Sequence, residues 1–112
     1  MENIVERIVI SKDFTDAPGA RSTKDGDFSG EEFLMKILLP KYELVRQTEG
    51  AVLHIDFDNV EGYATSFLEA AFGGLARKYP ASEILNHVRF KCEDEPMLVD
   101  EIKQYILEAN KK

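Results

Sequence analysis

Short runs of hydrophobic residues alternate along the chain with longer segments in which apolar residues recur every three or four positions. Residues 4–10 (IVERIVI) and 51–57 (AVLHIDF) are compact, β-branched runs, which predicts two strands. The second run is apolar at nearly every position, as expected for a central strand covered on both faces. Residues 84–91 (ILNHVRFK) alternate between apolar and polar types, which predicts a third strand near the sheet edge.

Amphipathic spacing predicts a helix after the first strand. Ser29 and Glu32 form a capping box ahead of an apolar stripe, so this helix is expected to begin at Ser29. Pro40 is expected to end it, because proline lacks the amide hydrogen and clashes with the preceding turn. Pro40 can instead start a second helix. The buried side of that second helix would be formed by Tyr42, Leu44 and Val45.

Another helix is expected from residue 65 to about residue 79. Thr65 or Ser66 is expected to cap it, and Ser66 with Glu69 forms a second capping box. Gly73 and Gly74 lie inside this helix at a cost of about 1 kcal/mol each relative to alanine. We therefore expect a close approach of the helix backbone to the sheet at this point.

The remaining segments complete the predicted order of elements. Residues 14–28 are rich in glycine, proline and charge, which predicts a long loop with a short strand near residues 20–23. A final helix is expected to begin at Glu95 and Pro96, since proline is tolerated in a first turn. Strand and helix thus alternate along most of the chain, which favours an α/β sandwich with a partly parallel sheet.

Composition narrows the class of protein. With 112 residues, of which 44% are hydrophobic, the chain is expected to form one domain with a modest core. Its net charge of −7 disfavours binding to nucleic acid through a basic surface. No apolar run approaches the roughly 20 residues of a membrane helix, and no signal peptide opens the chain, so we expect a soluble, cytoplasmic protein. Cys92 is the only cysteine, which excludes an intramolecular disulfide and a cysteine-cluster zinc site.

Residues 52–75 are the strongest candidate for a functional segment. They form a hydrophobic strand, a short acidic turn and a helix that starts with hydroxyl residues. Function in open α/β sheets tends to lie beyond the carboxyl ends of the strands, and a helix start offers free N–H groups to an anion. Thr65 and Ser66 therefore stand where a phosphate can be bound or attached. The simpler alternative is that they cap the helix.

Metal ligands are not evident in the sequence. A calcium loop starting at Asp56 fails, because Val60 and Phe67 occupy two of the ligand positions. His54 and His87 are expected on strands without ligand spacing to each other, so neither a metal site nor a cofactor is expected. Arg21, in the early loop, can clamp a carboxylate or a phosphate, or it can be a solvated surface residue.

The segment 52–75 is similar to the signature of STAS domains (sulphate transporter and anti-sigma factor antagonist). In that signature a strand ending in Leu-Asp-Leu leads to Asp-Ser-Ser-Gly at a helix start. The whole chain resembles more closely the bacterial STAS-like domain family of unassigned function. This resemblance is carried by Arg21, by Ser29-Gly30-Glu31-Glu32-Phe33 with Leu38-Leu39-Pro40, and by residues 66–75 (SFLEAAFGGL). It implies one STAS-like domain over residues 1–112, with a small mixed sheet and helices packed on it.

The STAS signature can be carried over in two ways. Asp56 matches the strand aspartate. Counting on without a gap puts Ala64 on the signature aspartate and Thr65 on the phosphoacceptor. One inserted residue puts Thr65 on the aspartate and Ser66 on the acceptor instead. In both alignments the signature aspartate is missing and Phe67 stands near its glycine, so Ser66 and Thr65 are the phosphoacceptor candidates.

The resemblance implies a bacterial regulatory protein rather than an enzyme. STAS antagonists bind an ATP-binding, histidine-kinase-like partner, which phosphorylates the serine or threonine after the signature aspartate. We therefore expect protein–protein recognition, controlled by phosphorylation, at the loop 58–65 and the helix that follows; the oligomeric state stays open. The residues expected to bind the partner are Asp58, Asn59, Tyr63, Phe67 and Glu69, joined by Arg21 and Ser29.

The sequence is also compatible with two alternative functions. Asp56 and Asp58 look like the first motif of haloacid-dehalogenase-type phosphatases, in which one aspartate is a nucleophile and the other a general acid, close to magnesium. The match is five residues long, and turn hydrogen bonds explain the same pattern. The other alternative is an adaptor subunit that binds a partner without switching.

Overall fold

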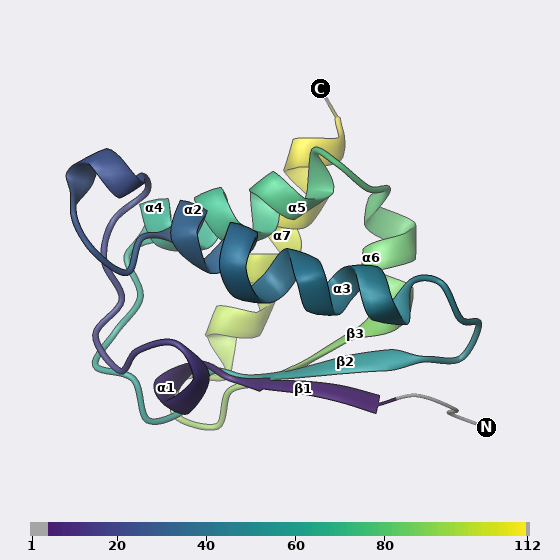
Figure 1. The fold of residues 1–112 in the computed structure, drawn as a ribbon, viewed down its shortest axis with the longest axis horizontal. Coiled ribbons are helices and arrows are strands. Elements are labelled where there is room, and N and C mark those ends of the chain that lie inside the picture. Colours follow the sequence, from purple (N-terminus) through teal and green to yellow (C-terminus); the bar gives the residue numbers. More distant parts are fainter. Residues whose placement is uncertain (1–4, 112) are drawn as a thin grey trace.

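The computed structural model describes residues 5–111, and its centre is a sheet of three parallel strands (Figure 1). The strands are β1 (Val5–Val9), β2 (Val52–Asp56) and β3 (Val88–Lys91), with β2 in the middle. Val5 pairs with Val52, and Leu53 pairs with Val88. The expected α/β fold and the central position of β2 are confirmed, but β2 is covered by helices on one face only, because His54 and Asp56 lie on the other face and are partly exposed. Ile4, where the first strand was expected to start, lies outside the described residues.

All three strands are parallel, whereas a mixed sheet was expected. The physical reason is that a helix-containing connection joins each strand to the next, which returns the chain to the same end of the sheet. The connecting and flanking elements are α1 (Ile10–Asp13), η1 (Thr23–Asp25), α2 (Gly30–Phe33), η2 (Leu34–Leu38), α3 (Leu39–Val45), α4 (Thr65–Leu68), η3 (Glu69–Gly73), α5 (Gly74–Ala76), α6 (Ala81–His87) and α7 (Met97–Asn110).

Two of these helices run on without a break through a wider, π-helical turn. The helix of residues 30–45 consists of α2, η2 and α3, and the helix of residues 65–76 consists of α4, η3 and α5. Pro40 therefore does not end the first helix, which corrects one expectation. In η2 the N–H of Leu39 donates to the carbonyl of Leu34, five residues back, and this wider turn precedes the proline that an α-helix would reject.

The two expected capping boxes have different outcomes. Ser29 caps α2, and its hydroxyl accepts the N–H of Glu32 at 3.0 Å, which confirms the first. The second is wrong: Ala64 is the cap residue of α4, and no side chain caps that helix start. Thr65 and Ser66 lie inside the first turn instead, because the extended backbone that a cap requires falls one residue earlier.

Helix replaces strand at two places. Residues 84–87 belong to α6, and only residues 88–91 form the edge strand. The alternation from residue 84 coincides with a helical spacing in which Ile84 and His87 are both buried. The short strand expected near residues 20–23 is also wrong, because Ser22 caps η1 there, its hydroxyl accepting the N–H of Lys24 at 3.0 Å.

The helices gather on one face of the sheet and enclose the core between the layers (Figure 1). Tyr42 and Val45 are buried as expected, but Leu44 is 55% exposed. The glycine pair approaches a helix rather than the sheet, since a Cβ on Gly74 would lie 2.7 Å from Leu34 Cδ2. The largest fully buried side chains include Ile8, Phe33, Tyr42, Leu53, Ile55, Phe57, Phe67, Phe72 and Leu75.

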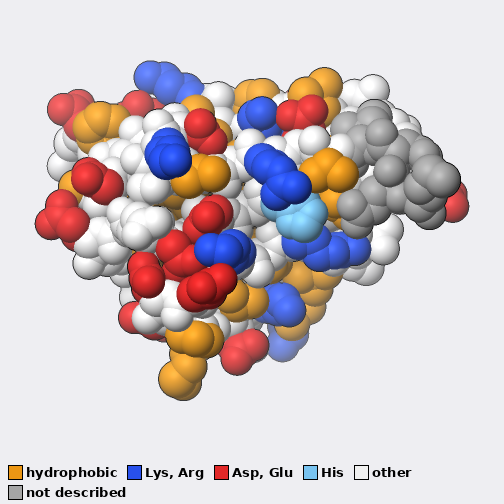
Figure 2. Space-filling view, turned by 90° about the horizontal axis from the view of Figure 1, so that it is seen from below, with side chains coloured by type: hydrophobic (Ala, Val, Ile, Leu, Met, Phe, Trp, Pro, Cys, Tyr) orange, Lys and Arg blue, Asp and Glu red, His pale blue; other side chains and the backbone are white. Residues whose placement is uncertain are grey.

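The other face of the sheet is open to solvent (Figure 2). In register across the three strands it carries Arg7, His54 and Arg89. The next row begins with Val9 and continues with Asp56 and Lys91. Within residues 5–111, no helix has the length and apolar character needed to cross a membrane.

Candidate functional site

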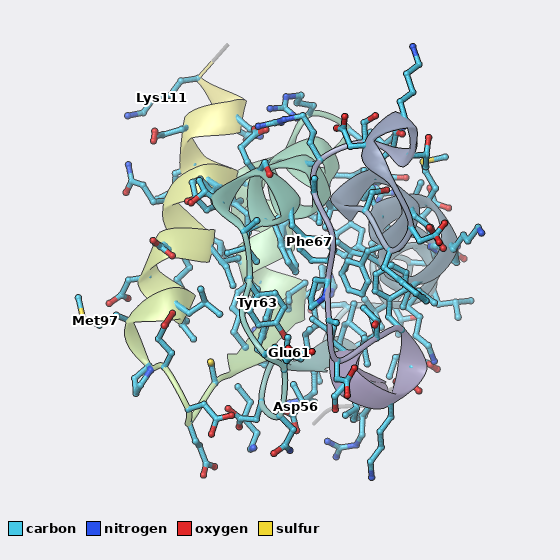
Figure 3. All side chains as sticks on the ribbon, turned by 90° about the vertical axis from the view of Figure 1, so that its left-hand side faces the viewer. Asp56, Glu61, Tyr63, Phe67, Met97 and Lys111 are labelled. Carbon is cyan, nitrogen blue, oxygen red and sulfur yellow. The ribbon has the colours of Figure 1, made fainter. Side chains whose placement is uncertain are left out.

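Because the strands are parallel, their carboxyl ends and the loops that follow meet at one edge of the sheet. Figure 3 shows this edge, with Asp56 at the end of β2 and Tyr63 in the next loop. A pocket of about 400 Å³ opens between the loop after β2 and the loop after β3. We call it the carboxyl-edge pocket. Its floor is formed by Phe57, Tyr63, Cys92 and Leu98, and the exposed carboxylates beside it belong to Glu61, Asp94 and Glu95.

Asp58 joins the two loops beneath this pocket. Its carboxylate is almost fully buried, accepts the N–H of Asp94 at 2.8 Å and pairs with Lys91 Nζ at 2.8 Å. Burial alone would raise the pKa of Asp58, but these hydrogen bonds outweigh burial and hold the pKa below its usual range. The same pair raises the pKa of Lys91. Asp58 therefore acts as a structural link between loops.

This link predicts that acid weakens the fold. The pKa of Asp58 is lower in the folded than in the unfolded chain, so its contribution to stability is complete above the unfolded value of about 4 and is lost as the pH falls below it. Asp58→Asn should lower the free energy of unfolding at pH 7 by about 1–2 kcal/mol. The variant should also lose less stability than the wild type below about pH 4. Urea unfolding at a series of pH values measures both effects.

A matched control is Asp100→Asn, because Asp100 is exposed on α7 and makes no side-chain hydrogen bond within the part of the chain that the structure describes. Its free energy of unfolding should stay within about 0.5 kcal/mol of the wild type at pH 7. Equal pH profiles for Asp58→Asn and the wild type would contradict the structural role of Asp58.

The loop between β2 and α4 is held in a defined shape. Asn59 is exposed, has a positive φ of 64° and donates its N–H to Asp94 Oδ2 at 2.9 Å. Tyr63 is half-buried and donates its hydroxyl to the carbonyl of Phe57 at 2.8 Å. Burial is the main reason that the pKa of Tyr63 is raised, with nearby carboxylates adding to it. The loop therefore presents Asn59 and Glu61 to solvent on a fixed backbone.

The two phosphoacceptor candidates lie side by side where this loop becomes a helix. Thr65 is exposed and Ser66 is partly exposed, and neither hydroxyl has a hydrogen-bond partner among the described residues. The first N–H groups of the helix and its dipole favour negative charge at this end. Both hydroxyls are accessible for modification in this geometry.

Glu69 lies one helical turn further on and binds two arginines. Its carboxylate pairs with Arg21, from the long early loop, and with Arg77, near the end of the same helix. Partial burial raises the pKa of Glu69, but the two guanidinium groups outweigh burial and lower it. Arg21 thus clamps a carboxylate of this chain, one of the two roles that its sequence position allowed. The pair also holds the early loop against η3.

Three of the expected partner-binding residues are buried, namely Ser29, Phe67 and the loop link Asp58. Ser29 has an exposed fraction of 0% and serves as the cap of α2. Phe67 is equally buried and packs against Phe33, with ring centroids 5.8 Å apart. In this structure these three residues support the surface from below. Asn59 and Arg21 are exposed, and Glu69 and Tyr63 are partly exposed.

Several residues at this edge escaped the sequence reasoning. Glu95 and Cys92 line the carboxyl-edge pocket together with Glu61, which lies in the expected loop 58–65 but was not singled out there. Burial raises the pKa of the Cys92 thiol. Met97, at the start of α7, is 79% exposed and follows the pocket residue Glu95 by two positions. An apolar residue outside the stripe of an amphipathic helix is the signal that could have identified Met97.

The arrangement of the acidic residues also bears on metals and on the phosphatase motif. Asp56 Oδ1 accepts the N–H of Asp58 at 2.9 Å, so the two aspartates form a turn in which Asp58 points into the protein. Over residues 5–111 there is no group of three or more histidine, cysteine or acidic side chains placed to hold a metal ion. His54 is half-exposed on β2, and His87, in α6, bonds through Nδ1 to the carbonyl of Ala51 at 2.8 Å.

The three-stranded parallel sheet with helices on one face and a pocket at its carboxyl edge defines a small α/β domain. The chain belongs to the family described as "STAS-like domain of unknown function (DUF4325)", which matches residues 29–97, more than half of its length. Among curated proteins and among solved structures, nothing matches the chain significantly. The family confirms the resemblance inferred from the sequence, and a STAS-like domain supports a role as a regulatory or interaction module.

Proposed function

We propose that this protein is a non-enzymatic regulatory module that binds a protein partner at the carboxyl edge of its sheet. The carboxyl-edge pocket is the observation that carries the proposal, since it combines an apolar floor with carboxylates at its mouth. Glu61 and Glu95 have no ion pair within the described chain, so their charge is available to a partner. A basic side chain with an apolar stem, such as arginine or lysine, matches this pocket.

Met97 extends the proposed surface beyond the pocket. Among residues 5–111 it is the most exposed of the large hydrophobic side chains, and Figure 3 shows it projecting outward on the α7 side of the carboxyl edge. Exposed apolar side chains beside charged ones are typical of the centre and rim of an interface. The partner class is an ATP-binding, histidine-kinase-like protein, which rests on the STAS-like family.

A charge placed at Met97 tests the surface. Met97→Asp should weaken binding to the candidate kinase-like protein at least about tenfold, because it puts a charge into the desolvated part of the contact. Leu107→Asp is the matched control, since Leu107 is 44% exposed on the same helix, away from the pocket. Isothermal titration calorimetry measures both affinities. Equal losses, or no binding by the wild type, would refute the proposed surface.

We propose further that Thr65 or Ser66 receives a phosphoryl group from this partner. A phosphate adds about −1.5 to −2 charges and three acceptor oxygens at pH 7. At this helix start the dipole tolerates that charge. Where the partner packs an apolar face against Thr65 and Ser66, the phosphate would have to lose its hydration, so binding would end without a large conformational change.

Intact-mass analysis after incubation with the kinase-like protein and ATP tests the switch. We expect a gain of one phosphoryl group in the wild type and none in a variant in which Thr65 and Ser66 are both alanine. Ser82→Ala is the control, because Ser82 is an exposed hydroxyl in the first turn of α6. A phosphate that survives loss of both hydroxyls refutes the switch. Stable binding without any phosphate supports an adaptor that does not switch.

A further inference from the structure

The free edge of β3 has main-chain groups that no other element uses. The N–H of Phe57 donates to the carbonyl of Lys91 at 2.8 Å, so the main-chain groups of Lys91 point toward β2. Main-chain groups point alternately to the two sides of a strand, and those of Phe90 therefore point away from β2. Within residues 5–111 no hydrogen bond to the N–H or carbonyl of Phe90 is found.

Other main-chain groups of the two outer edges have partners. At the start of β3, the N–H of Val88 donates to the carbonyl of Ile84, and its own carbonyl accepts from Arg89 Nη1 at 3.1 Å. At the opposite edge, the N–H of Val9 in β1 donates to Asp13 Oδ2 at 2.7 Å. An unpaired main chain at a strand edge is a template for another strand, and Phe90 is such an open position with a groove beside it.

A groove lies against this open position. It has a volume of about 340 Å³ and is lined by Leu85, Val88, Phe90 and Val99, with the cations Arg89 and Lys103 beside them. Val99 and Lys103 are one turn apart on α7, so this helix forms the far wall. The groove thus combines an apolar hollow, an unpaired main-chain position and two positive charges.

The two cations are placed differently but act on the same groove. Arg89 Nη1 donates to the carbonyls of Asn86 at 3.0 Å and Leu85 at 3.3 Å, at the end of α6, so its position is fixed. Lys103 is exposed and has no ion pair within the described residues. Although the chain carries a net charge of −7, this edge favours an acidic ligand.

We propose that the free edge of β3 binds an extended, acidic peptide segment of another protein as a fourth strand of the sheet. The peptide pairs with the N–H and carbonyl of Phe90, places an apolar side chain in the hollow, and directs flanking carboxylates to Arg89 and Lys103. This is strand addition, in which main-chain bonds give affinity and the pockets for alternate side chains give specificity.

A second copy of this chain fits the edge less well than such a peptide. Two β3 strands that pair antiparallel about Phe90 place Arg89 of each copy opposite Lys91 of the other. Like charges directly opposite each other destabilise a strand pair. The site also lies apart from the carboxyl-edge pocket, because the two linings share no residue.

The test uses the acetylated and amidated peptide Glu-Val-Glu-Val-Glu and the isotope-labelled full chain. On titration we expect the largest saturable change of amide chemical shift at Phe90. The peptide Lys-Val-Lys-Val-Lys should produce none. No saturable shift at millimolar peptide, or shifts centred on the loop 58–65, would overturn the proposal.

Charge reversal on α7 tests the role of Lys103. Lys103→Glu should weaken peptide binding at least about threefold, because it replaces an attraction by a repulsion. Lys111→Glu makes the same charge change beyond the groove and should bind like the wild type. Equal binding by Lys103→Glu and the wild type would refute the assignment. If the free protein is a dimer and Lys103→Glu dissociates it, the occupant of the β3 edge is a second copy of this chain and not a peptide.

Discussion

Replacing Gly30 with alanine lowers the free energy of unfolding by about 2–3 kcal/mol, through overpacking at a helix crossing. Gly30 is buried in the first turn of α2. A Cβ at this position would overlap the carbonyl oxygen of Phe67 in α4 and would lie 3.0 Å from the Cβ of Ala70. The main obstacle is main chain, which cannot rotate aside, so the two helices must move apart. Urea unfolding, with the slope checked for two-state behaviour, measures the loss.

Gly62→Ala is the control for this substitution. Gly62 lies in the loop before α4, and no atom lies within 4 Å of the position that its Cβ would take. The free energy of unfolding should change by less than about 0.5 kcal/mol. Similar losses in the free energy of unfolding for Gly30→Ala and Gly62→Ala would show that α2 and α4 pack less closely than the structure indicates.

Replacing Phe67 with alanine has the largest expected effect, a loss of about 3–5 kcal/mol in the free energy of unfolding. Phe67 is 0% exposed and belongs to a cluster of aromatic rings. Its ring centroid lies 5.8 Å from that of Phe33, 6.0 Å from that of Tyr63 and 6.3 Å from that of Phe14. Because these rings come from three segments, the cavity would loosen the early loop and the loop after β2 together.

Phe28→Ala separates this core effect from the loss of aromatic surface in general. Phe28 is 41% exposed and meets the same cluster only edge-on, at 5.4 Å from Phe14. Its replacement should cost about 0.5–1.5 kcal/mol. Thermal unfolding of both variants ranks them. If Phe67→Ala were as mild as Phe28→Ala, Phe67 would not be the packed residue that the structure describes.

The local pattern of apolar residues predicted the elements that bury a regular set of side chains, such as β2 and α7. The apolar run 51–57 gives β2, because this strand lies between two neighbours and buries Leu53 and Ile55 beneath the helices. The stripe of α7 gives a helix of 14 residues, with Leu98, Ile102 and Ile106 buried. In both elements the burial of the side chains follows the spacing of the strand or the helix, so the pattern of apolar residues in the sequence predicts them.

Patterns failed where two periods coincide or where a tertiary contact decides. Ile84, His87 and Val88 satisfy a helical spacing as well as part of an alternation, and α6 uses the helical one. Ser66 and Glu69 have the spacing of a capping box, but Glu69 binds Arg21, which is 48 residues away in the sequence. A contact between residues so far apart in the chain cannot be predicted from the sequence around either residue.

The candidate site was predictable in position but only partly in composition. The loop after β2 follows from the rule that parallel strands direct function to their carboxyl ends. The pocket itself is formed by that loop together with residues 92–98, and their proximity depends on the pairing of β2 with β3. The sequence pattern of the β2 segment therefore predicted the loop 58–65, which contains Glu61 and Tyr63, but it missed Glu95 and Met97.

The wider turn η2 gives one helix two different orientations along its length. A π turn adds a residue to the helix, so the side chains after it are rotated relative to those before it. The first part, α2, contacts α4 and η3, while α3 contacts β1 and β2. Deleting one residue from 34–38 would restore the regular phase and swing the Tyr42 hydroxyl away from Glu83, its present acceptor at 2.5 Å. The extra residue in η2 therefore sets the rotational phase of α3. This phase, as much as the apolar composition of the helix, determines how the helical layer packs on the sheet.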